Sequence, residues 1–182
     1  MSVLPSITVR FARESDLRCL AVLATQVFLD TYATTGIRAS IADEVLRSFS
    51  VAAFEALLAH DDTVIALAEI EGHLVGFSQV TVGRGQELVR ASTPAELERL
   101  YVQEPFTYMG IGSRLLASAE EDARTLGATA MWLTPWVHNA RARQFYRKHG
   151  YVDVGATFFR LDDERHENRV IVKQFAGEHG EG

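Results

Sequence analysis

The stretch LERLYVQEPFTYMGIGSRLLASAEEDARTLG, residues 97–127, contains the pattern that decides the fold prediction. It reads as a strand over about 97–103, a short loop with two glycines, and a helix closed by Gly127. The first N–H groups of a helix have no partner within the helix, and the helix dipole adds positive potential at the same end. Because Gly110 and Gly112 let an oxyanion approach the backbone closely, we predict that this loop binds a phosphate group.

Two other phosphate-binding loops fit this stretch poorly. A nucleoside-triphosphatase loop requires Gly-Lys-Ser/Thr, whereas Ser113 and Arg114 follow Gly112. A Rossmann loop requires a third glycine at the position of Leu115. On this stretch alone, a connection whose glycines only relieve crowding between strand and helix stays open.

Length and charge narrow the class of protein. The chain has 182 residues and a formal net charge of -6. The length suits one domain with a buried core, and the acidity argues against a protein that coats nucleic acid. Cys19 is the single cysteine, which excludes an internal disulfide and favours a reducing, cytoplasmic location. No stretch approaches the roughly 20 apolar residues of a membrane helix, and the first residues lack the apolar core of a signal peptide.

Apolar spacing and turn residues outline the remaining elements. We predict one α/β domain over residues 1–176, followed by a disordered tail over 177–182, with residues 84–95 as a loop. Beyond the strand and helix of residues 97–127, strands are expected at 7–12, in a hairpin over 62–83, and at 129–137, 151–161 and 168–175, and helices at 14–33, 40–49, 51–60 and 139–149.

A second pattern lies in WLTPWVHNARARQFYRKHGY, residues 132–151. A strand leads into a helix with the spacing N-x-x-A-x-x-F-Y-x-x-x-G-Y. Together with the glycine loop, this pattern resembles the GNAT superfamily of acetyl-CoA-dependent N-acetyltransferases. The resemblance implies a single-domain α/β fold with a mixed, mostly antiparallel central sheet, two splayed parallel strands and flanking helices. The matching residues are Asn139, Ala142, Phe145, Tyr146, Gly150 and Tyr151.

The resemblance assigns acetyl-CoA to the glycine loop and to the strand before it. The backbone of Leu100 to Val102 is expected to pair with the pantetheine arm and to polarise the acetyl carbonyl, and Asn139 to bond the arm. Thr107 stands where the superfamily usually has Arg or Gln, so a side-chain contact to the pyrophosphate is expected to be weaker, with Arg114 as another source of charge. The residues assigned to the cofactor are Leu100, Tyr101, Val102, Tyr108, Met109, Gly110, Ile111, Gly112, Ser113 and Asn139.

The chemistry requires a neutral amine, a polarised thioester carbonyl and a proton for the departing thiolate. Tyr146 matches the tyrosine that serves as general acid in the family, although an aromatic pair on a helix is usually core packing. Glu96 and Glu98 fall two residues apart on one strand face, and either could draw the amine proton through water. The histidines lack metal-ligand spacing, so no metal is expected, and Cys19 is expected in the core.

Three segments, 27–33, 132–151 and 158–175, further resemble the bacterial Pai-type polyamine acetyltransferases. This implies a polyamine acceptor such as spermidine, while other small amines, antibiotics and a protein N-terminus stay open. A catalytically weak acyl-CoA sensor of the same fold is the alternative function. The expected partners are a small-molecule amine and, as an open alternative, a second copy in a homodimer, with no nucleic acid and no membrane. Acidic and aromatic residues expected around the amine are Asp30, Tyr32, Asp43, Glu44, Asp162, Asp163 and Glu164.

Overall fold

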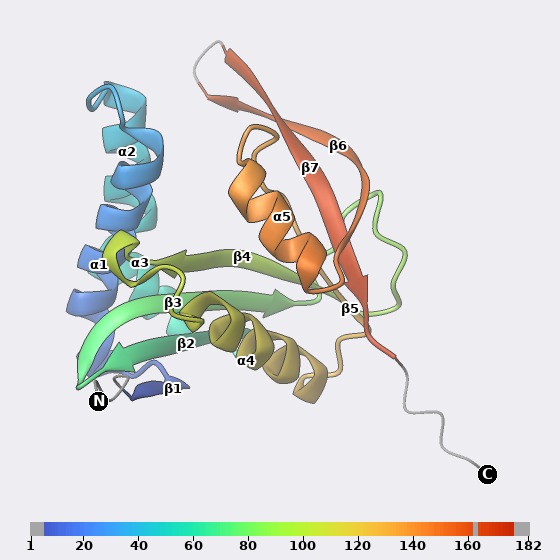
Figure 1. The fold of residues 1–182 in the computed structure, drawn as a ribbon, viewed down its shortest axis with the longest axis horizontal. Coiled ribbons are helices and arrows are strands. Elements are labelled where there is room, and N and C mark those ends of the chain that lie inside the picture. The colour runs from blue at the N-terminus through green and yellow to red at the C-terminus, as the bar shows by residue number, and fades with distance from the viewer. Residues whose placement is uncertain (1–5, 162–163, 177–182) are drawn as a thin grey trace. The chain divides into compact units, whose positions relative to one another are not determined.

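The computed structural model describes residues 6–161 and 164–176 (Figure 1). The chain divides into two compact units. The first comprises Met1–Val80 and Glu98–Glu121, and the second comprises Thr81–Leu97 and Asp122–Gly182.

The elements alternate between strands and helices along the chain. The strands form one seven-stranded sheet in the order β1-β2-β3-β4-β5-β7-β6, with one parallel pair recorded, β4 with β5. This confirms the α/β class and the mixed sheet that the sequence predicts. The elements are β1 (Ile7–Phe11), α1 (Leu17–Tyr32), α2 (Ala39–Ser48), α3 (Val51–Leu58), β2 (Thr63–Ile70), β3 (His73–Val82), β4 (Pro94–Val102), α4 (Ile111–Thr125), β5 (Ala130–Leu133), α5 (Ala140–Lys148), β6 (Val152–Leu161) and β7 (Glu164–Gln174).

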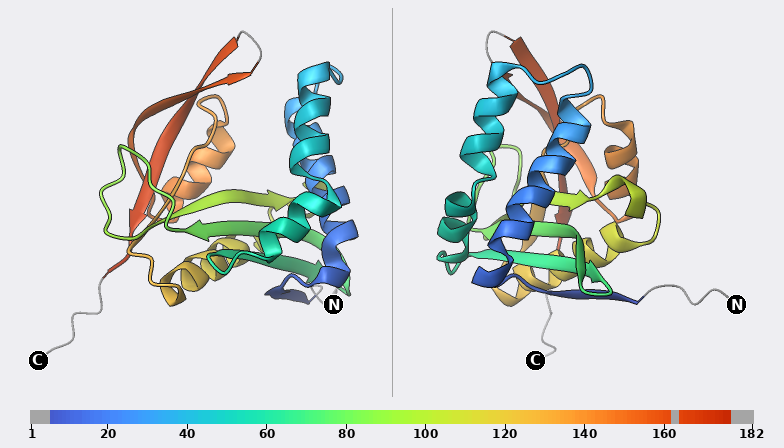
Figure 2. Two further views of the ribbon diagram at one scale, coloured as in Figure 1. Left: turned by 180° about the vertical axis from the view of Figure 1, so that it is seen from behind. Right: turned by 90° about the vertical axis from the view of Figure 1, so that its left-hand side faces the viewer.

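Helices α1 and α3 lie over one face of the strands of the first unit (Figure 2). An aromatic-rich core lies between these helices and the strands. Leu20 and Leu23 on the inward face of α1 pack with Phe54 of α3 and with Leu67 and Phe77 from the sheet. Phe54 and Phe77 are fully buried and meet edge to face at 5.9 Å between ring centres. Burial of such large side chains fixes the helices on the sheet.

The opposite face of the same strands packs against α4. Ala66 and Val75 alternate with the residues of the first core and pack with Ile111 and Leu115. Because successive strand residues point to opposite faces, β2 and β3 are buried on both sides. The start of α4 is therefore anchored in the core of the first unit.

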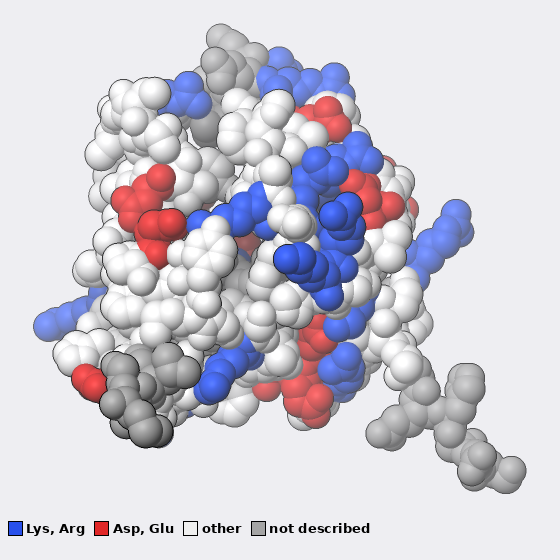
Figure 3. All heavy atoms as spheres, viewed as in Figure 1, with Lys and Arg blue, Asp and Glu red and all other residues white. Residues whose placement is uncertain are grey.

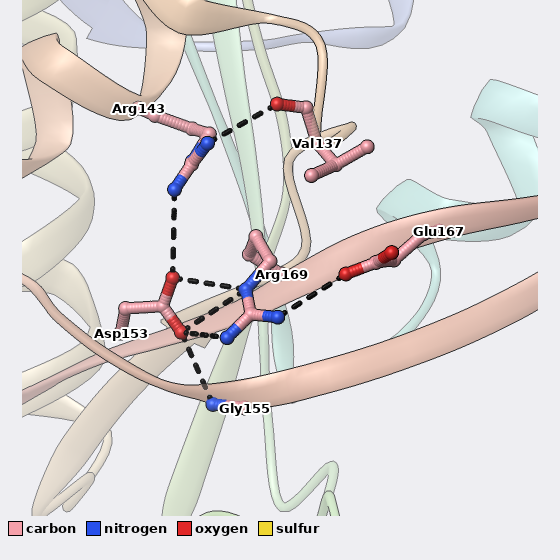
Figure 4. A network of polar contacts seen from close by, with 6 residues as sticks. All are labelled: Val137, Arg143, Asp153, Gly155, Glu167 and Arg169. Atoms are coloured by element: carbon pink, nitrogen blue, oxygen red, sulfur yellow. Dashed lines mark hydrogen bonds and ion pairs between the residues drawn. The ribbon is translucent and has the colours of Figure 1, made fainter.

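The second unit is built on β5, whose four residues are all buried. Pro94 to Glu96 pair in parallel with Ala130 to Trp132, and β7 pairs antiparallel with the other side of β5. The Trp132 indole Nε1 donates to the Arg84 carbonyl at 2.8 Å, which ties residues 84–95 to the strand. The hairpin of β6 and β7 shifts register between Asp153 and Gly155, where Asp153 meets Arg169 (Figure 4).

Several predicted boundaries differ from the structure. β4 begins at Pro94 inside the predicted loop, because the Gly83 amide donates to the Pro94 carbonyl at 2.8 Å and extends the ladder. β5 ends at Leu133, before the predicted residue 137. Cys19 is exposed, so the prediction that it is buried was wrong: the inward face of α1 is formed by Leu17, Leu20, Ala21, Leu23 and Ala24.

Some predictions lie outside the described residues or stay predictions. Asp162, Asp163 and the tail 177–182 lie outside the described residues, as does the side chain of Glu164. Over the described ranges, every helix is too short or too polar to cross a membrane. The single domain over 1–176, the homodimer and the cytoplasmic location stay predictions.

Candidate active site

The loop between β4 and α4 has an unusual backbone. Tyr108 and Gly110 adopt positive φ values of 66° and 80°, and Tyr108 is 89% exposed. A residue other than glycine in this region costs energy, and such strain gathers at functional sites. The Thr107 hydroxyl donates to the Glu104 carbonyl at 2.8 Å, which closes the turn before the loop.

The space beside Gly110 is open. A Cβ built on Gly110 would have no heavy atom within 4 Å, and the residue is exposed. Directly after it, Ile111 and Leu115 are almost completely buried and fix the first turn of α4. The first N–H groups of α4 are thus held rigidly at a surface with room for a ligand, as the sequence predicts for a phosphate group.

Arg114 has a position that the sequence did not indicate. Its Nη1 donates to the carbonyl of Ile7 in β1 at 3.0 Å. One of its donors is therefore engaged by the first strand. Its suggested role as a source of charge for the pyrophosphate stays a prediction, as does binding of the pyrophosphate by the main-chain amides of 108–113.

The end of β4 separates two environments. Leu100 and Val102 pack toward Ile111 and Leu115, while Tyr101 packs on the opposite face with the aromatic core of the first unit. A Cβ on Gly76 of β3 would lie only 2.7 Å from the Tyr101 carbonyl oxygen, so the close approach of the two strands requires glycine there. The recorded pairing of β4 with β5 ends at Glu96, six residues before β4 itself ends at Val102.

Beside this end of β4 lies a polar cluster that was not predicted from the sequence. Arg99 Nη1 donates to Gln79 Oε1, and the charge of Arg99 also acts on the Tyr101 side chain. Burial, with the nearby Tyr32 phenol as a second cause, raises the pKa of Tyr101 above its usual value, so this phenol stays protonated. We call Arg99, Gln79 and Tyr101 the Arg99 cluster. Its signal in the sequence was a charged residue alternating with Leu97 and Tyr101 on one strand face.

The Arg99 guanidinium is surrounded by aromatic rings. It lies 5.0 Å from the ring centre of Phe49 and 5.9 Å from that of Phe54. Such cation–π contacts hold the guanidinium plane in place. Arg99 as a residue is half-buried.

In the second unit, Asn139 begins α5 as predicted. Its Oδ1 accepts a hydrogen bond from the Ala142 amide at 3.0 Å, which satisfies a donor of the first turn. This cap uses the side-chain oxygen. The side-chain amide nitrogen is the donor that the predicted contact to the pantetheine arm would use.

Tyr146 lies on the buried face of α5 and is 7% exposed. Its ring packs edge to face with Phe145 at 5.1 Å and with Tyr151 at 5.6 Å between centres. The ring therefore has the packing role that the sequence left open. That packing also fixes where the hydroxyl lies. Its role as general acid stays a prediction.

The two glutamates predicted as general bases lie on β4, as expected. Glu96 pairs in register with Trp132 and lies 3.7 Å from Arg84 as an ion pair. Glu98 is half-buried. Glu96 belongs to the second unit and Glu98 to the first, and the catalytic role of each stays a prediction.

Acidic side chains gather over α2, as Figure 3 shows. Glu44 hydrogen-bonds Arg47 and also accepts from the Ser48 hydroxyl at 2.6 Å. Asp30 and Asp43 are exposed, and Tyr32 packs on Phe28 with 4.7 Å between ring centres. Over α5, by contrast, Lys and Arg side chains gather (Figure 3). This helix carries Arg141, Arg143, Arg147 and Lys148.

Each unit brings part of the predicted site together. The first unit holds Leu100 to Val102 and the loop 108–113 around the start of α4, and the second holds Glu96, Asn139 and Tyr146. Within the described ranges, no group of three or more His, Cys, Asp or Glu side chains could hold a metal ion.

Comparison with known proteins identifies the family. The model of the acetyltransferase (GNAT) family matches residues 28–151. The chain is 24% identical over 160 residues to an uncharacterized N-acetyltransferase of Lactobacillus delbrueckii subsp. lactis, which covers 88% of this chain and 92% of the relative. It is 34% identical over 98 residues to the aminoalkylphosphonate N-acetyltransferase of Salmonella typhimurium, covering 54% of this chain and 62% of that protein.

Solved structures share the fold. The PaiA N-acetyltransferase of Thermoplasma acidophilum, in complex with coenzyme A, has a TM-score of 0.75 at 22% identity and covers 93% of this chain and 99% of its own. NAA60 of Arabidopsis thaliana, in complex with a bisubstrate analogue, has a TM-score of 0.71 at 18% identity and covers 94% of this chain and 99% of its own. The chain belongs to the GNAT acetyltransferase family and is an acyltransferase of that family.

Proposed function

We propose that this protein transfers the acetyl group of acetyl-CoA to the primary amine of a small molecule. The observation that supports this most is the loop before α4, where Tyr108 and Gly110 adopt positive φ and the space beside Gly110 is open. An anion-binding helix start of this kind suits the pyrophosphate of coenzyme A. The two residues of positive φ position the amides of 108–113 before a ligand arrives.

The reaction needs the chain's own groups at three points. The backbone N–H groups of Leu100 to Val102 would donate to the thioester oxygen, where negative charge develops as the amine nitrogen bonds to the carbonyl carbon. The tetrahedral intermediate then breaks its carbon–sulfur bond. Tyr146 would give its hydroxyl proton to the departing thiolate, and the amine proton would leave through water to Glu96 or Glu98.

The polyamine acceptor is supported by two observations. Acidic side chains of α1 and α2, including Asp30 and Asp43, are exposed and would attract a cation. The PaiA protein of Thermoplasma acidophilum shares the fold over nearly the whole chain. A competing acceptor, an amine that also carries an anionic group, is favoured by the name of the aminoalkylphosphonate relative.

Thiol release from acetyl-CoA with a panel of amines tests the proposal. The panel contains spermidine, glycine, 2-aminoethylphosphonate and ethylamine, with product identified by mass. Release of coenzyme A that depends on an amine, with acetylated product, supports the proposal. Calorimetric binding of acetyl-CoA without transfer to any amine would indicate the acyl-CoA sensor instead. For a cationic acceptor, the Michaelis constant should rise with ionic strength, because exposed attractions are screened within about 10 Å at ordinary salt.

A further inference from the structure

We propose that Arg99 binds an anionic oxygen group, a carboxylate or phosphonate, on the acceptor amine. This rests on the proposed function and names the class of its substrate. The acceptor would be a short amino acid or aminoalkylphosphonate, whose amine takes the acetyl group while its oxyanion meets Arg99. The inference comes from the hydrogen-bonding state of the Arg99 cluster.

In the part of the chain that the structure describes, the charge of Arg99 has no carboxylate partner. Within the described residues no Asp or Glu forms an ion pair with it, and its recorded contacts are Gln79, Tyr101 and the rings of Phe49 and Phe54. A cation taken partly out of water is costly unless an opposite charge meets it. A guanidinium held in a fixed plane is well suited to bind a carboxylate or phosphonate through two parallel hydrogen bonds.

The hydrogen bond with Arg99 fixes the orientation of the Gln79 side-chain amide. Its side chain is completely buried, and its Oε1 accepts from Arg99. The Arg99 guanidinium can only donate hydrogen bonds. A flip of the Gln79 side-chain amide would therefore place its NH2 group against the N–H groups of Arg99. Gln79 Nε2 therefore stays directed away from Arg99, and it is buried with no hydrogen-bond partner in the described part of the chain. An unsatisfied buried donor of this kind is uncommon and indicates a missing acceptor.

Tyr101 adds a second donor to the cluster. Its phenol lies close enough to Arg99 for the two groups to interact, and burial raises the pKa of Tyr101, so the phenol keeps its proton and can donate. Glu44 and the Tyr32 phenol are the other titratable groups whose charges act on this hydroxyl. The guanidinium of Arg99 and the phenol of Tyr101 are thus both donors, and a pair of donors selects a ligand rich in oxygen acceptors.

The position of the cluster suits the acceptor. Arg99 and Tyr101 flank Leu100, whose backbone is proposed to hold the thioester. Strand residues advance about 3.3 Å each, so the oxyanion site lies within roughly 10 Å of the reacting carbonyl. That spacing suits an amine and an oxyanion separated by only a few bonds. Exposed Asp30 and Asp43 on neighbouring helices would attract the ammonium end of such a molecule.

The test compares acceptors of matched size in wild type and Arg99→Gln. Glycine and 2-aminoethylphosphonate supply the two oxyanions, glycinamide and ethylamine are uncharged at the corresponding group, and spermidine represents the polyamines. We expect wild-type kcat/KM to be at least about tenfold higher for an oxyanion amine than for its uncharged match, since one good charged hydrogen bond exceeds a factor of ten. Glycine and 2-aminoethylphosphonate distinguish carboxylate from phosphonate.

Arg99→Gln should remove this preference mainly through KM, while the uncharged amines change less than about threefold. Arg124→Gln is the matched control, because Arg124 also lies over an aromatic ring, that of Phe175 at 4.1 Å, outside the proposed site. If Arg99→Gln fails to fold, wild type alone still decides: methylphosphonate or acetate should inhibit in competition with the acceptor and not with acetyl-CoA. Gln79→Met, which keeps the volume and removes the amide, should reduce the preference as well.

Three results would overturn the inference. One is equal or better use of spermidine or ethylamine by wild type. Another is a fall in kcat/KM to the same extent for all acceptors in Arg99→Gln, which would indicate that the arginine has only a structural role. The third is a failure to acetylate any amine, which overturns the proposed function and this inference together. The first two leave the proposed function standing, because acetyl transfer itself is then observed.

Discussion

Arg169 holds Asp153 across the β6–β7 hairpin through two nitrogens, with Nη2 at 2.8 Å from Oδ1 and Nε at 3.0 Å from Oδ2 (Figure 4). Asp153 also accepts from the Gly155 amide at 3.1 Å, at the point where the register shifts. The hydrogen bonds from Arg169, more than any other cause, lower the pKa of Asp153 below its usual value. The bulge in β6 is therefore stabilised by a charged contact.

Asp153→Asn should lower the free energy of unfolding near pH 7 by about 0.5–1 kcal/mol, a modest value because solvent screens this partly exposed pair. A carboxyl with a depressed native pKa stabilises the fold above its unfolded pKa, near 3.9, and loses that effect as the pH falls through the native value. The difference between wild type and variant should thus shrink below about pH 4. Urea melts from pH 7 to pH 3 measure it, with the exposed Asp62→Asn as control. A difference that does not change with pH would contradict this account.

Tyr146→Phe keeps the buried ring and removes only the hydroxyl. If that hydroxyl protonates the thiolate, kcat should fall about 100-fold or more with little change in acetyl-CoA affinity. Pre-steady-state measurements must show that chemistry limits the rate, because slow product release would hide the loss. Near-normal kcat would restrict Tyr146 to packing with Phe145 and Tyr151, and weaker acetyl-CoA binding at normal kcat would make it a cofactor contact.

Gly110→Val should weaken acetyl-CoA binding at least tenfold, about 1.4 kcal/mol, because the side chain fills the space beside the loop amides. Gly127→Val at the other end of α4 is the matched control: it too has positive φ, 87°, and open space around a Cβ. Both substitutions impose similar backbone strain, so their stabilities should fall alike while calorimetry separates their affinities. Equal acetyl-CoA affinity of the two folded variants would refute the loop assignment.

Asn139→Ser and Asn139→Ala separate two roles of one side chain. Serine keeps an oxygen for the Ala142 amide, whereas alanine removes the cap and should cost about 1 kcal/mol of stability. If the Asn139 amide nitrogen bonds the pantetheine arm, both variants should bind acetyl-CoA more weakly. If only Asn139→Ala binds acetyl-CoA more weakly, helix capping is the only contribution of this residue.

Glu96→Gln and Glu98→Gln identify the general base. Removal of the base should lower kcat/KM by about 100-fold or more and abolish the acidic limb of its pH profile. Glu96 is engaged by Arg84, so Glu96→Gln also tests that ion pair through stability. Two unchanged pH profiles would exclude both residues and leave the bound amine to lose its proton to solvent.

Local signals in the sequence were enough for α5 and for the loop before α4. Asn139 caps through its nearest amides, and Gly110 reports a backbone conformation that few other residues adopt. Cys19 could not be placed this way, because the helical spacing of α1 leaves room for more than one inward face. The predicted end of β5 at residue 137 was wrong as well, because the residues after Leu133 meet β7 through Val137 and Glu167, a contact that apolar spacing does not reveal.

The Arg99 cluster lay beyond sequence reasoning for a different reason. Gln79 and Arg99 are far apart in the chain and meet only once β3 and β4 pair. An unsatisfied donor such as Gln79 Nε2 has no signature in composition or periodicity, since it is defined by what surrounds it. The catalytic assignments that follow from the family motif stay predictions until the variants above are measured.

The close approach of β3 and β4 at Gly76 has a consequence for catalysis. Because a single added carbon there would lie 2.7 Å from the Tyr101 carbonyl oxygen, the position of the β4 amides proposed to activate the thioester depends on a residue of the neighbouring strand β3. Mutational scans that look only for ligand-facing positions would overlook it. A methyl group at Gly76 should therefore lower the rate of acetyl transfer. The affinity for acetyl-CoA should change little, because the loop before α4 is not altered.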